Sequence, residues 1–166
     1  MPEDRRQNGR STDGGAIDAT NRRLLAELQG DARLSLAELG RRVGLSSPAV
    51  AERLARLERN GVILGYHARI DPRALGFALS AVIRVRPAPG QLKLVARVAV
   101  ETPEVVECRR ITGEDCYGML AHVRSVEHLE EVIDRFAAHG QTTTSIVQSS
   151  PVPPRGLDVG ERPERA

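Results

Sequence analysis

Small polar residues and arginines share one side of a short segment, residues 46–59. The candidate contact residues are Ser46, Ser47, Pro48, Ala49, Glu52, Arg53, Arg56 and Arg59. Small side chains at a helix start allow close approach to base edges, and a guanidinium group can hold a phosphate or a guanine. This order of residue types therefore predicts a surface that inserts into the major groove of double-stranded DNA. The base sequence that it reads does not follow, because only a base contact carries sequence information.

Two short helices around a tight turn are needed to position that surface. Leu36, Leu39 and Val43 recur at helical spacing, which predicts the first helix. Gly44 can take the positive φ that ends a helix, and Ser46 can cap the next one. The pattern is typical of a helix-turn-helix.

The second helix has one apolar side and one polar side. Val50, Leu54 and Leu57 form the apolar stripe, and the candidate contact residues fall largely opposite it at about 100° per residue. A further helix over residues 19–29, capped by Asp18, completes a three-helix unit. The alternative interpretation is a helix packed inside an enzyme with solvated arginines on its outer side.

A second group of candidate residues surrounds two glycines in the other half of the chain. Its members are Gly113, Glu114, Asp115, Cys116, Tyr117, Gln141, Thr142, Thr143 and Thr144. Exposed backbone amides near a glycine can accept the carboxylate of an amino acid, and acidic or hydroxyl oxygens can meet its ammonium group. We therefore expect an effector site here. An ordinary hairpin turn followed by a threonine-rich strand would use the same residues.

The net charge of +2 conceals an uneven distribution. Residues 16–75 hold ten arginines and seven acidic residues, whereas residues 76–150 hold eight basic and nine acidic residues. The basic bias therefore lies with the helix-turn-helix. No apolar run is long enough for a membrane span or a leader, so we expect a cytoplasmic protein without a membrane partner.

Catalytic and metal-binding interpretations have little support. If the strands on either side of the turn pair, Cys108 faces about Leu120 and lies away from Cys116. A chain with two cysteines is typical of a reducing compartment. The histidines show no ligand spacing with either cysteine, and no nucleophile with a base, phosphate loop or carboxylate pair is recognisable. We expect no enzyme activity, no metal and no cofactor.

Patterning divides the chain into five parts. They are a disordered arm (1–15), a helix-turn-helix domain (16–61), a wing or linker strand (62–76), a ferredoxin-like domain (77–150) and a disordered tail (151–166). Within the fourth part, strands are expected at 77–86, 105–111, 117–123 and 143–148, and helices near 90–101 and 126–139. This β-α-β-β-α-β order predicts two helices on one face of a four-stranded antiparallel sheet. The other face would carry Val82, Val106 and Leu120, which favours dimerisation.

Residues 16–150 resemble the Lrp/AsnC (feast/famine) family of transcriptional regulators. The resemblance rests on Ile17-Asp18, residues 24–29, Val43-Gly44-Leu45-Ser46, residues 53–58, residues 61–66, and Thr112-Gly113 before Tyr117. It implies an α+β protein with a winged helix-turn-helix domain followed by a ferredoxin-like domain for amino-acid sensing. It also implies dimers that often assemble into octamers. The family places an aspartate just before the tyrosine, where this chain has Cys116, and we therefore expect an effector with a small or apolar side chain.

These observations predict a sequence-specific regulator of transcription that binds double-stranded DNA and responds to an amino acid or related metabolite. A metabolite-sensing oligomerisation module whose helix-turn-helix mediates protein contacts is the main alternative. A small enzyme is a third possibility. DNA binding separates the first from the second, and a catalytic assay tests the third.

Overall fold

The computed structural model describes residues 17–160, which form two compact units. One unit contains the described residues up to Ala68 together with those from Pro154 onward, and the other is Arg69–Pro153. The arm expected over residues 1–15 and the last residues of the tail, 161–166, lie outside the described residues.

The first unit consists of three helices, each with a polar side chain at its start. They are α1 (Ala19–Gly30), α2 (Leu36–Val43) and α3 (Ser47–Arg59). Asp18, Ser35 and Ser46 each accept a hydrogen bond from a backbone N–H in the first turn of the helix that follows. A residue of this kind satisfies one of the unpaired N–H groups at a helix start, and it sets where the helix begins.

A small apolar core joins the three helices. Its buried members are Leu24, Leu39, Val43, Val50, Leu54 and Leu57. The apolar stripe predicted on α3 therefore faces the core, and the polar side of α3 faces solvent.

The turn between α2 and α3 depends on two glycines. Gly44 has φ +75°, the left-handed conformation that ends α2 at little cost for a residue without Cβ. The N–H of Leu45 then donates to the carbonyl of Gly40 at 2.9 Å. A Cβ on Gly40 would lie 2.3 Å from the carbonyl oxygen of Leu45, so only glycine permits this close approach.

The expected strand after α3 is not formed. Backbone N–H groups of Val62 and Ile63 donate to the carbonyl of Leu57, and residues 64–71 contain no helix or strand. A short 3₁₀ helix, η1 (Pro72–Leu75), follows. Alternating apolar residues favour an extended backbone, but a strand also needs a neighbour to pair with, and the described chain supplies none here.

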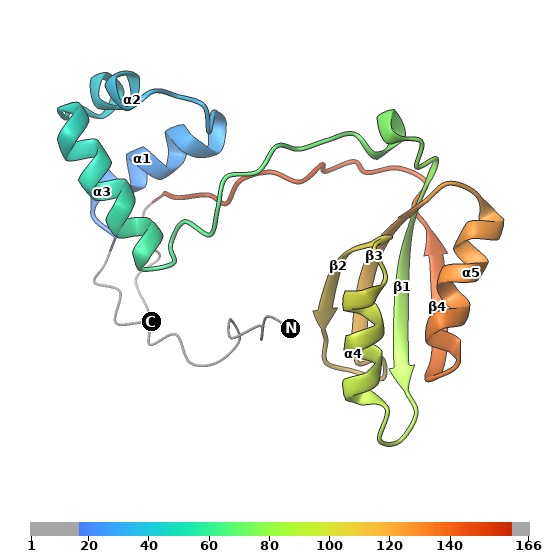
Figure 1. Ribbon diagram of the computed structural model, residues 1–166. Coiled ribbons are helices and arrows are strands. Elements are labelled where there is room, and N and C mark those ends of the chain that lie inside the picture. The colour runs from blue at the N-terminus through green and yellow to red at the C-terminus, as the bar shows by residue number, and fades with distance from the viewer. Residues whose placement is uncertain (1–16, 161–166) are drawn as a thin grey trace. The chain divides into compact units, whose positions relative to one another are not determined.

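The second unit follows the predicted order of elements. They are β1 (Leu79–Pro87), α4 (Leu92–Glu101), β2 (Val105–Arg110), β3 (Tyr117–Val123), α5 (Val126–Ala137) and β4 (Gly140–Ile146). The strand order is β2-β3-β1-β4 and all neighbours are antiparallel. Figure 1 shows α4 and α5 on one face of this sheet. The fold class expected from the sequence, α+β with a ferredoxin-like unit after a helix-turn-helix, is confirmed.

The core of the second unit lies between the sheet and its two helices. Alternate residues of β1 and β3, among them Ile83 and Met119, point into it and meet Val95, Val132 and Phe136 of the helices. Because side chains alternate along a strand, the intervening residues form the opposite, open face. That open face determines which polar groups can meet a ligand or a second subunit.

The turn between β2 and β3 corrects one expected strand register. Arg110 pairs with Tyr117, so the turn is centred between Gly113 and Glu114, and Cys108 faces Met119 instead of Leu120. Further from the turn, the pairing shifts between Val105 and Glu107, where a bulge places one extra residue on β2.

The last strand begins three residues earlier than expected. Gly140 pairs with Pro87, and a Cβ at Gly140 would lie 2.3 Å from the carbonyl oxygen of Arg86. The absent side chain lets the two backbones approach closely, so the strand can start at this residue. Residues 141–144, expected to lead into the strand, are therefore part of it.

The open face of the sheet is mixed in character. Val82 is 40% exposed, Leu120 is half-buried, and Val106, at the irregularity of β2, is 58% exposed. Arg84 and Arg86 alternate with the core residues of β1, and both are exposed. The expected apolar residues are exposed or half-buried, but the face also carries strong positive charge.

Candidate DNA interface and effector site

The exposed side of α3 carries most of the candidate DNA-contacting residues. Ser46, Pro48, Glu52, Arg56 and Arg59 are exposed, whereas Ser47 and Ala49 are half-buried. The side chain of Ser46 is already engaged, because its Oγ accepts a hydrogen bond from the N–H of Ala49 at 3.4 Å. Exposed side chains at the start of α3 and arginines near its end could contact base edges and phosphates respectively.

Arg53 is occupied by the first helix. Its Nη1 donates to Oδ2 of Asp18 at 2.7 Å and to Oδ1 of Asn21 at 3.0 Å, and its side chain is only 27% exposed. The hydrogen bond from Arg53, followed by that from the N–H of Asn21, lowers the pKa of Asp18. Arg53 therefore fixes α3 against the start of α1, and its expected contact with DNA stays a prediction.

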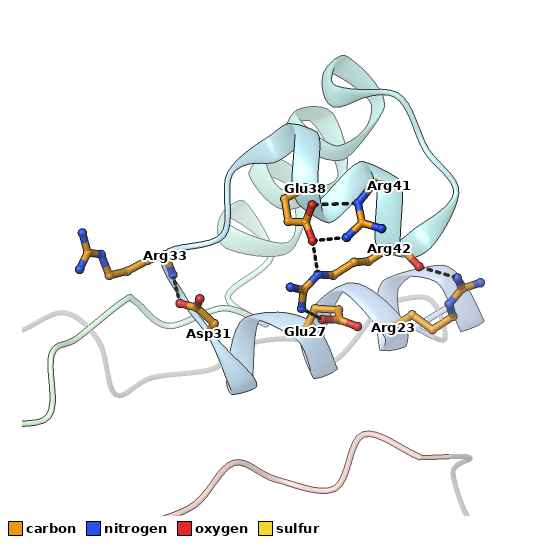
Figure 2. A network of polar contacts seen from close by, with 7 residues as sticks. All are labelled: Arg23, Glu27, Asp31, Arg33, Glu38, Arg41 and Arg42. Atoms are coloured by element: carbon orange, nitrogen blue, oxygen red, sulfur yellow. Dashed lines mark hydrogen bonds and ion pairs between the residues drawn. The ribbon is translucent and has the colours of Figure 1, made fainter.

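A network of charged residues holds α2 against α1 (Figure 2). Oε1 of Glu38 accepts from Arg41 at 2.6 Å and from Arg42 at 2.7 Å, and Arg42 also donates to Glu27 of α1 at 2.7 Å. The hydrogen bonds from Arg41 and Arg42 lower the pKa of Glu38 to about 2. Arg23 of α1 adds a bond to the backbone oxygen of Arg42.

Two exposed arginines of this network were not among the candidate contact residues. Arg41 and Arg42 lie in the last turn of α2, beside the turn that leads to α3. Their spacing of three and four residues from Glu38 is visible in the sequence and predicts such pairs. They bring further positive charge to the helix-turn-helix, although each is partly neutralised by its acidic partner.

The candidate effector residues come together around β1. In the sheet, Arg84 lies between Gly118 of β3 and Thr143 of β4, and Arg86 lies opposite Gln141. The two arginines were not recognised as site residues from the sequence, because their position between the hairpin turn and β4 is a consequence of strand order.

The acidic residues of the turn are paired with these arginines. Glu114 accepts from Nη2 of Arg86 at 2.5 Å, and Asp115 lies 3.7 Å from Nε of Arg84. Both carboxylates therefore already have cationic partners within the chain. The pair of Glu114 is the easier to open, because the Glu114 side chain is 86% exposed.

Gly113 leaves the turn open to solvent. Its φ is +110°, and a Cβ built there would meet no atom within 4 Å. Among residues 17–160, the N–H groups of Gly113, Glu114 and Asp115 have no hydrogen-bond acceptor, whereas that of Cys116 donates to Val85 at 3.0 Å. Three successive backbone donors thus remain available to an anionic group.

The alternation of side chains divides the remaining candidates between two faces. Gln141 and Thr143 lie on the open face with Arg84 and Arg86, whereas Thr142 and Thr144 point toward the helices. Tyr117 is also buried on the helix side. Its hydroxyl donates to the carbonyl of Leu92 at 3.0 Å.

Cys116 is half-buried and packs against the core of the second unit. Across residues 17–160, no three His, Cys, Asp or Glu side chains gather as metal ligands would. The same residues include no helix of the length and apolarity that a membrane crossing requires.

Comparison with known families matches both units. Residues 17–58 match the AsnC-type helix-turn-helix domain, and residues 80–157 match the Lrp/AsnC ligand binding domain. The first match spans α1 to α3, and the second includes all the candidate effector residues.

Relatives of this chain are transcriptional regulators. It is 42% identical over 134 residues to the uncharacterized HTH-type transcriptional regulator YezC of Bacillus subtilis, covering 81% of this chain and 95% of that protein. It is 39% identical over 135 residues to the HTH-type transcriptional regulator LrpA of Mycobacterium tuberculosis, covering 80% and 90% respectively.

Solved structures agree with the sequence relatives. The feast or famine regulatory protein of M. tuberculosis, complexed with L-methionine, superposes with a TM-score of 0.81 at 36% identity, over 86% of this chain and 99% of that one. The chain therefore belongs to the Lrp/AsnC family of transcriptional regulators, in which a DNA-binding helix-turn-helix domain is joined to a ligand-binding domain.

Proposed function

We propose that α3 enters the major groove of double-stranded DNA and that its exposed side reads the operator. The observation that carries this proposal is the position of Pro48, Glu52, Arg56 and Arg59 on solvent, opposite the buried Val50, Leu54 and Leu57 stripe. Ser46 and Ser47 lie at the helix start, within reach of a phosphate or base edge. Arg41 and Arg42 add charge for the flanking phosphates.

Selection of bound sequences from a random DNA pool by the full chain tests this proposal. We expect enrichment of paired half-sites whose centres are separated by about one helical turn of DNA or a multiple of it, because a symmetric dimer presents two recognition helices. Recovery of unenriched DNA at all salt concentrations would overturn the assignment of α3 as a sequence reader.

We infer that the ligand is an amino acid bound on the open face beside the turn at Gly113. The free N–H groups of Gly113, Glu114 and Asp115 can receive a carboxylate, as can the guanidinium of Arg86 once Glu114 moves away. The released carboxylate of Glu114 and the side chains of Gln141 and Thr143 can then accept from the ammonium group. The L-methionine complex of the M. tuberculosis relative supports an amino acid as the class of ligand.

The side chain of the preferred amino acid follows from the charges around the turn. Cys116 stands where the family pattern has an aspartate, which removes one negative charge. Asp115 is paired with Arg84, and Glu114, once released from Arg86, pairs with the ammonium group of the ligand. A basic side chain would therefore meet little uncompensated negative charge, and we expect a small or apolar amino acid to bind more tightly.

Calorimetric titration of the full chain with each of the twenty amino acids tests this site. Gly113→Val is expected to abolish binding, because a branched residue strains the φ of +110° and covers the free N–H groups. Gly90→Val is the matched control, since Gly90 has φ +80° and equally open surroundings but lies in the turn before α4. No binding below millimolar concentration, or equal binding by Gly113→Val, would exclude the site.

We further propose that the open sheet face pairs with a second copy of the chain. Val82 and Leu120 sit on neighbouring strands, directly opposite each other, and a sheet with one uncovered face is a poor monomer. Sedimentation of Val82→Arg should show weakened self-association. Val100→Arg on α4, where the parent side chain is 87% exposed, should sediment like the parent. Unchanged association of Val82→Arg would place the dimer interface elsewhere.

A further inference from the structure

Residues near the end of the described chain lie along α1. Nη1 of Arg22 donates to the carbonyl oxygens of Gly160 at 2.5 Å and Val159 at 3.3 Å. Nε2 of Gln29 donates to the carbonyl oxygen of Leu157 at 3.0 Å. Arg22 and Gln29 are seven residues apart, so they lie on the same side of the helix two turns from each other. Side chains of α1 thus bind the backbone of this segment at both ends.

This segment borders a cavity of about 670 Å³ inside the first unit, with a lining of mixed polarity. Its apolar lining includes Leu25 and Leu28 of α1, Ile63 and Leu64 after α3, and Leu157 and Val159. Val159 is half-buried, whereas Leu157 is 84% exposed. The apolar contact is therefore made mainly through Val159.

Gly156 fits this arrangement by lacking a side chain. A Cβ at that position would lie 2.3 Å from Oε1 and 3.0 Å from Cβ of Gln29. The terminal atoms of Gln29 could swing away, but its hydrogen bond to Leu157 would then be lost. A side chain at position 156 would therefore cost the hydrogen bond between Gln29 and Leu157.

The contact between residues 156–160 and α1 brings the chain back to the first unit after the sheet. The backbone leaves the first unit after Ala68, forms the sheet, and rejoins the first unit at Pro154, soon after β4 ends at Ile146. The DNA-binding helices are thus joined to the ligand-binding unit at two points, provided that residues 156–160 stay on α1. Residues 157–160, which belong to the tail expected to be disordered, lie against α1 with their carbonyl groups bonded to Arg22 and Gln29.

We propose that residues 156–160 form a C-terminal strap that docks on α1 and restricts the orientations available to the DNA-binding helices. Its effect on DNA rests on the proposed function of α3. Two recognition helices must meet two half-sites at a fixed spacing, and the freedom that remains before binding is lost on binding. A docked strap removes part of that freedom in advance.

Tryptophan fluorescence in the full chain tests the docking. The chain contains no tryptophan, so Val159→Trp introduces a single reporter. We expect iodide to quench it several-fold less than free tryptophan. Adding Arg22→Ala and Gln29→Ala should restore most of the quenching. Adding Arg23→Ala instead removes an equal charge from α1 but should leave the reporter protected, because Arg23 bonds to Arg42.

Two quenching results would overturn the docking. Full quenching in all three proteins means that the segment is free in solution. Protection that disappears on dilution assigns the segment to α1 of a second copy, and it contradicts docking within one chain.

DNA affinity tests the consequence in chains without the reporter. On labelled DNA with paired half-sites, Arg22→Ala/Gln29→Ala should bind about three- to tenfold more weakly than Arg23→Ala, by fluorescence anisotropy. Equal affinities would overturn the restricting role while leaving the docking result intact. Failure of the parent chain to bind any DNA would refute the role of α3 and with it this effect on DNA, whereas the quenching experiment still decides whether the strap docks.

Discussion

The carboxylate that caps α1 is the same one that holds α3. Asp18 accepts from the N–H of Asn21 at 2.6 Å through Oδ1 and from Nη1 of Arg53 at 2.7 Å through Oδ2. One side chain thus sets the start of α1 and the position of α3 against it. Arg53 and Arg56 lie one turn apart, but only Arg56 is left on solvent.

Arg53→Ala should lower the stability of the helix-turn-helix. The variant loses hydrogen bonds to Asp18 and Asn21, and we expect a free energy of unfolding lower by about 1 kcal/mol, since the pair is partly exposed. Urea denaturation followed by circular dichroism measures this change. The pKa of Asp18 should also rise toward its ordinary value. Because a lowered folded-state pKa stabilises above the unfolded value, part of the loss of stability on acidification below about pH 4 should disappear.

Arg56→Ala should leave stability nearly unchanged and weaken DNA binding. Its side chain is exposed and forms no hydrogen bond within the described chain, so stability should stay within about 0.5 kcal/mol of the parent. Specific DNA binding should weaken by about 1–3 kcal/mol if the guanidinium reads a base. If it contacts only phosphate, the loss should be uniform across sequences and the salt dependence shallower. Unchanged DNA affinity would mean that this side of α3 does not face the groove.

Gly40→Ala should destabilise the turn between α2 and α3. The new Cβ would lie 2.3 Å from the carbonyl oxygen of Leu45, and relief requires the backbone to move, at a cost of about 1–3 kcal/mol. Gly30→Ala is the control, because nothing lies within 4 Å of its Cβ and alanine favours the helix. Thermal unfolding should show a lower midpoint for Gly40→Ala and an equal or higher one for Gly30→Ala. Equal stability of Gly40→Ala and the parent would contradict the close approach.

Tyr66 should ionise at unusually high pH. Partial desolvation of the hydroxyl, and then its hydrogen bond to Glu58 at 2.9 Å, raise the pKa of Tyr66 to about 12, while 46% of the residue is exposed. In Glu58→Gln the pKa of Tyr66 should fall but stay above 10, because desolvation is the larger cause. A raised folded-state pKa stabilises below the unfolded value, so the parent should lose this contribution as pH rises from about 10 through 12.

Ultraviolet absorbance during alkaline titration resolves this ionisation. The chain has two tyrosines, so the difference between parent and Glu58→Gln isolates Tyr66. Identical titration curves would show that Glu58 does not contact the hydroxyl in solution.

Arg86→Ala should weaken amino-acid binding at the proposed effector site by at least about tenfold. A charge-assisted contact with a carboxylate is among the stronger hydrogen bonds, and Arg86 is the guanidinium that faces both the turn and Gln141. Arg97→Ala on the exposed side of α4 removes the same charge from the other layer of the unit and should bind like the parent. Calorimetry compares the three proteins. Equal affinity of Arg86→Ala would move the carboxylate to another donor.

Local patterns determine the elements of this protein. Caps at Asp18 and Ser46, the apolar stripe of Val50, Leu54 and Leu57, and alternation within β1 and β3 each depend on residues close together in the chain. Such features carry their own periodicity and capping chemistry, so the helix-turn-helix and the β-α-β-β-α-β order follow from the sequence. The candidate DNA-contacting side of α3 follows in the same way, because it is the opposite of a buried stripe.

Contacts between distant residues needed the tertiary structure. The pairing of Arg53 with Asp18 spans 35 residues, and that of Arg86 with Glu114 spans 28, so neither appears in a local pattern. The centre of the turn between β2 and β3 set the partner of Cys108, and the close approach at Gly140 extended β4.

Contacts between distant residues also decide which arginines of α3 pair within the protein and which stay exposed to solvent. The sequence alone determines which helix carries the arginines. Only the folded chain determines that Arg53 supports α1 while Arg56 remains on solvent, since a side chain's partners are set by packing between elements far apart in sequence.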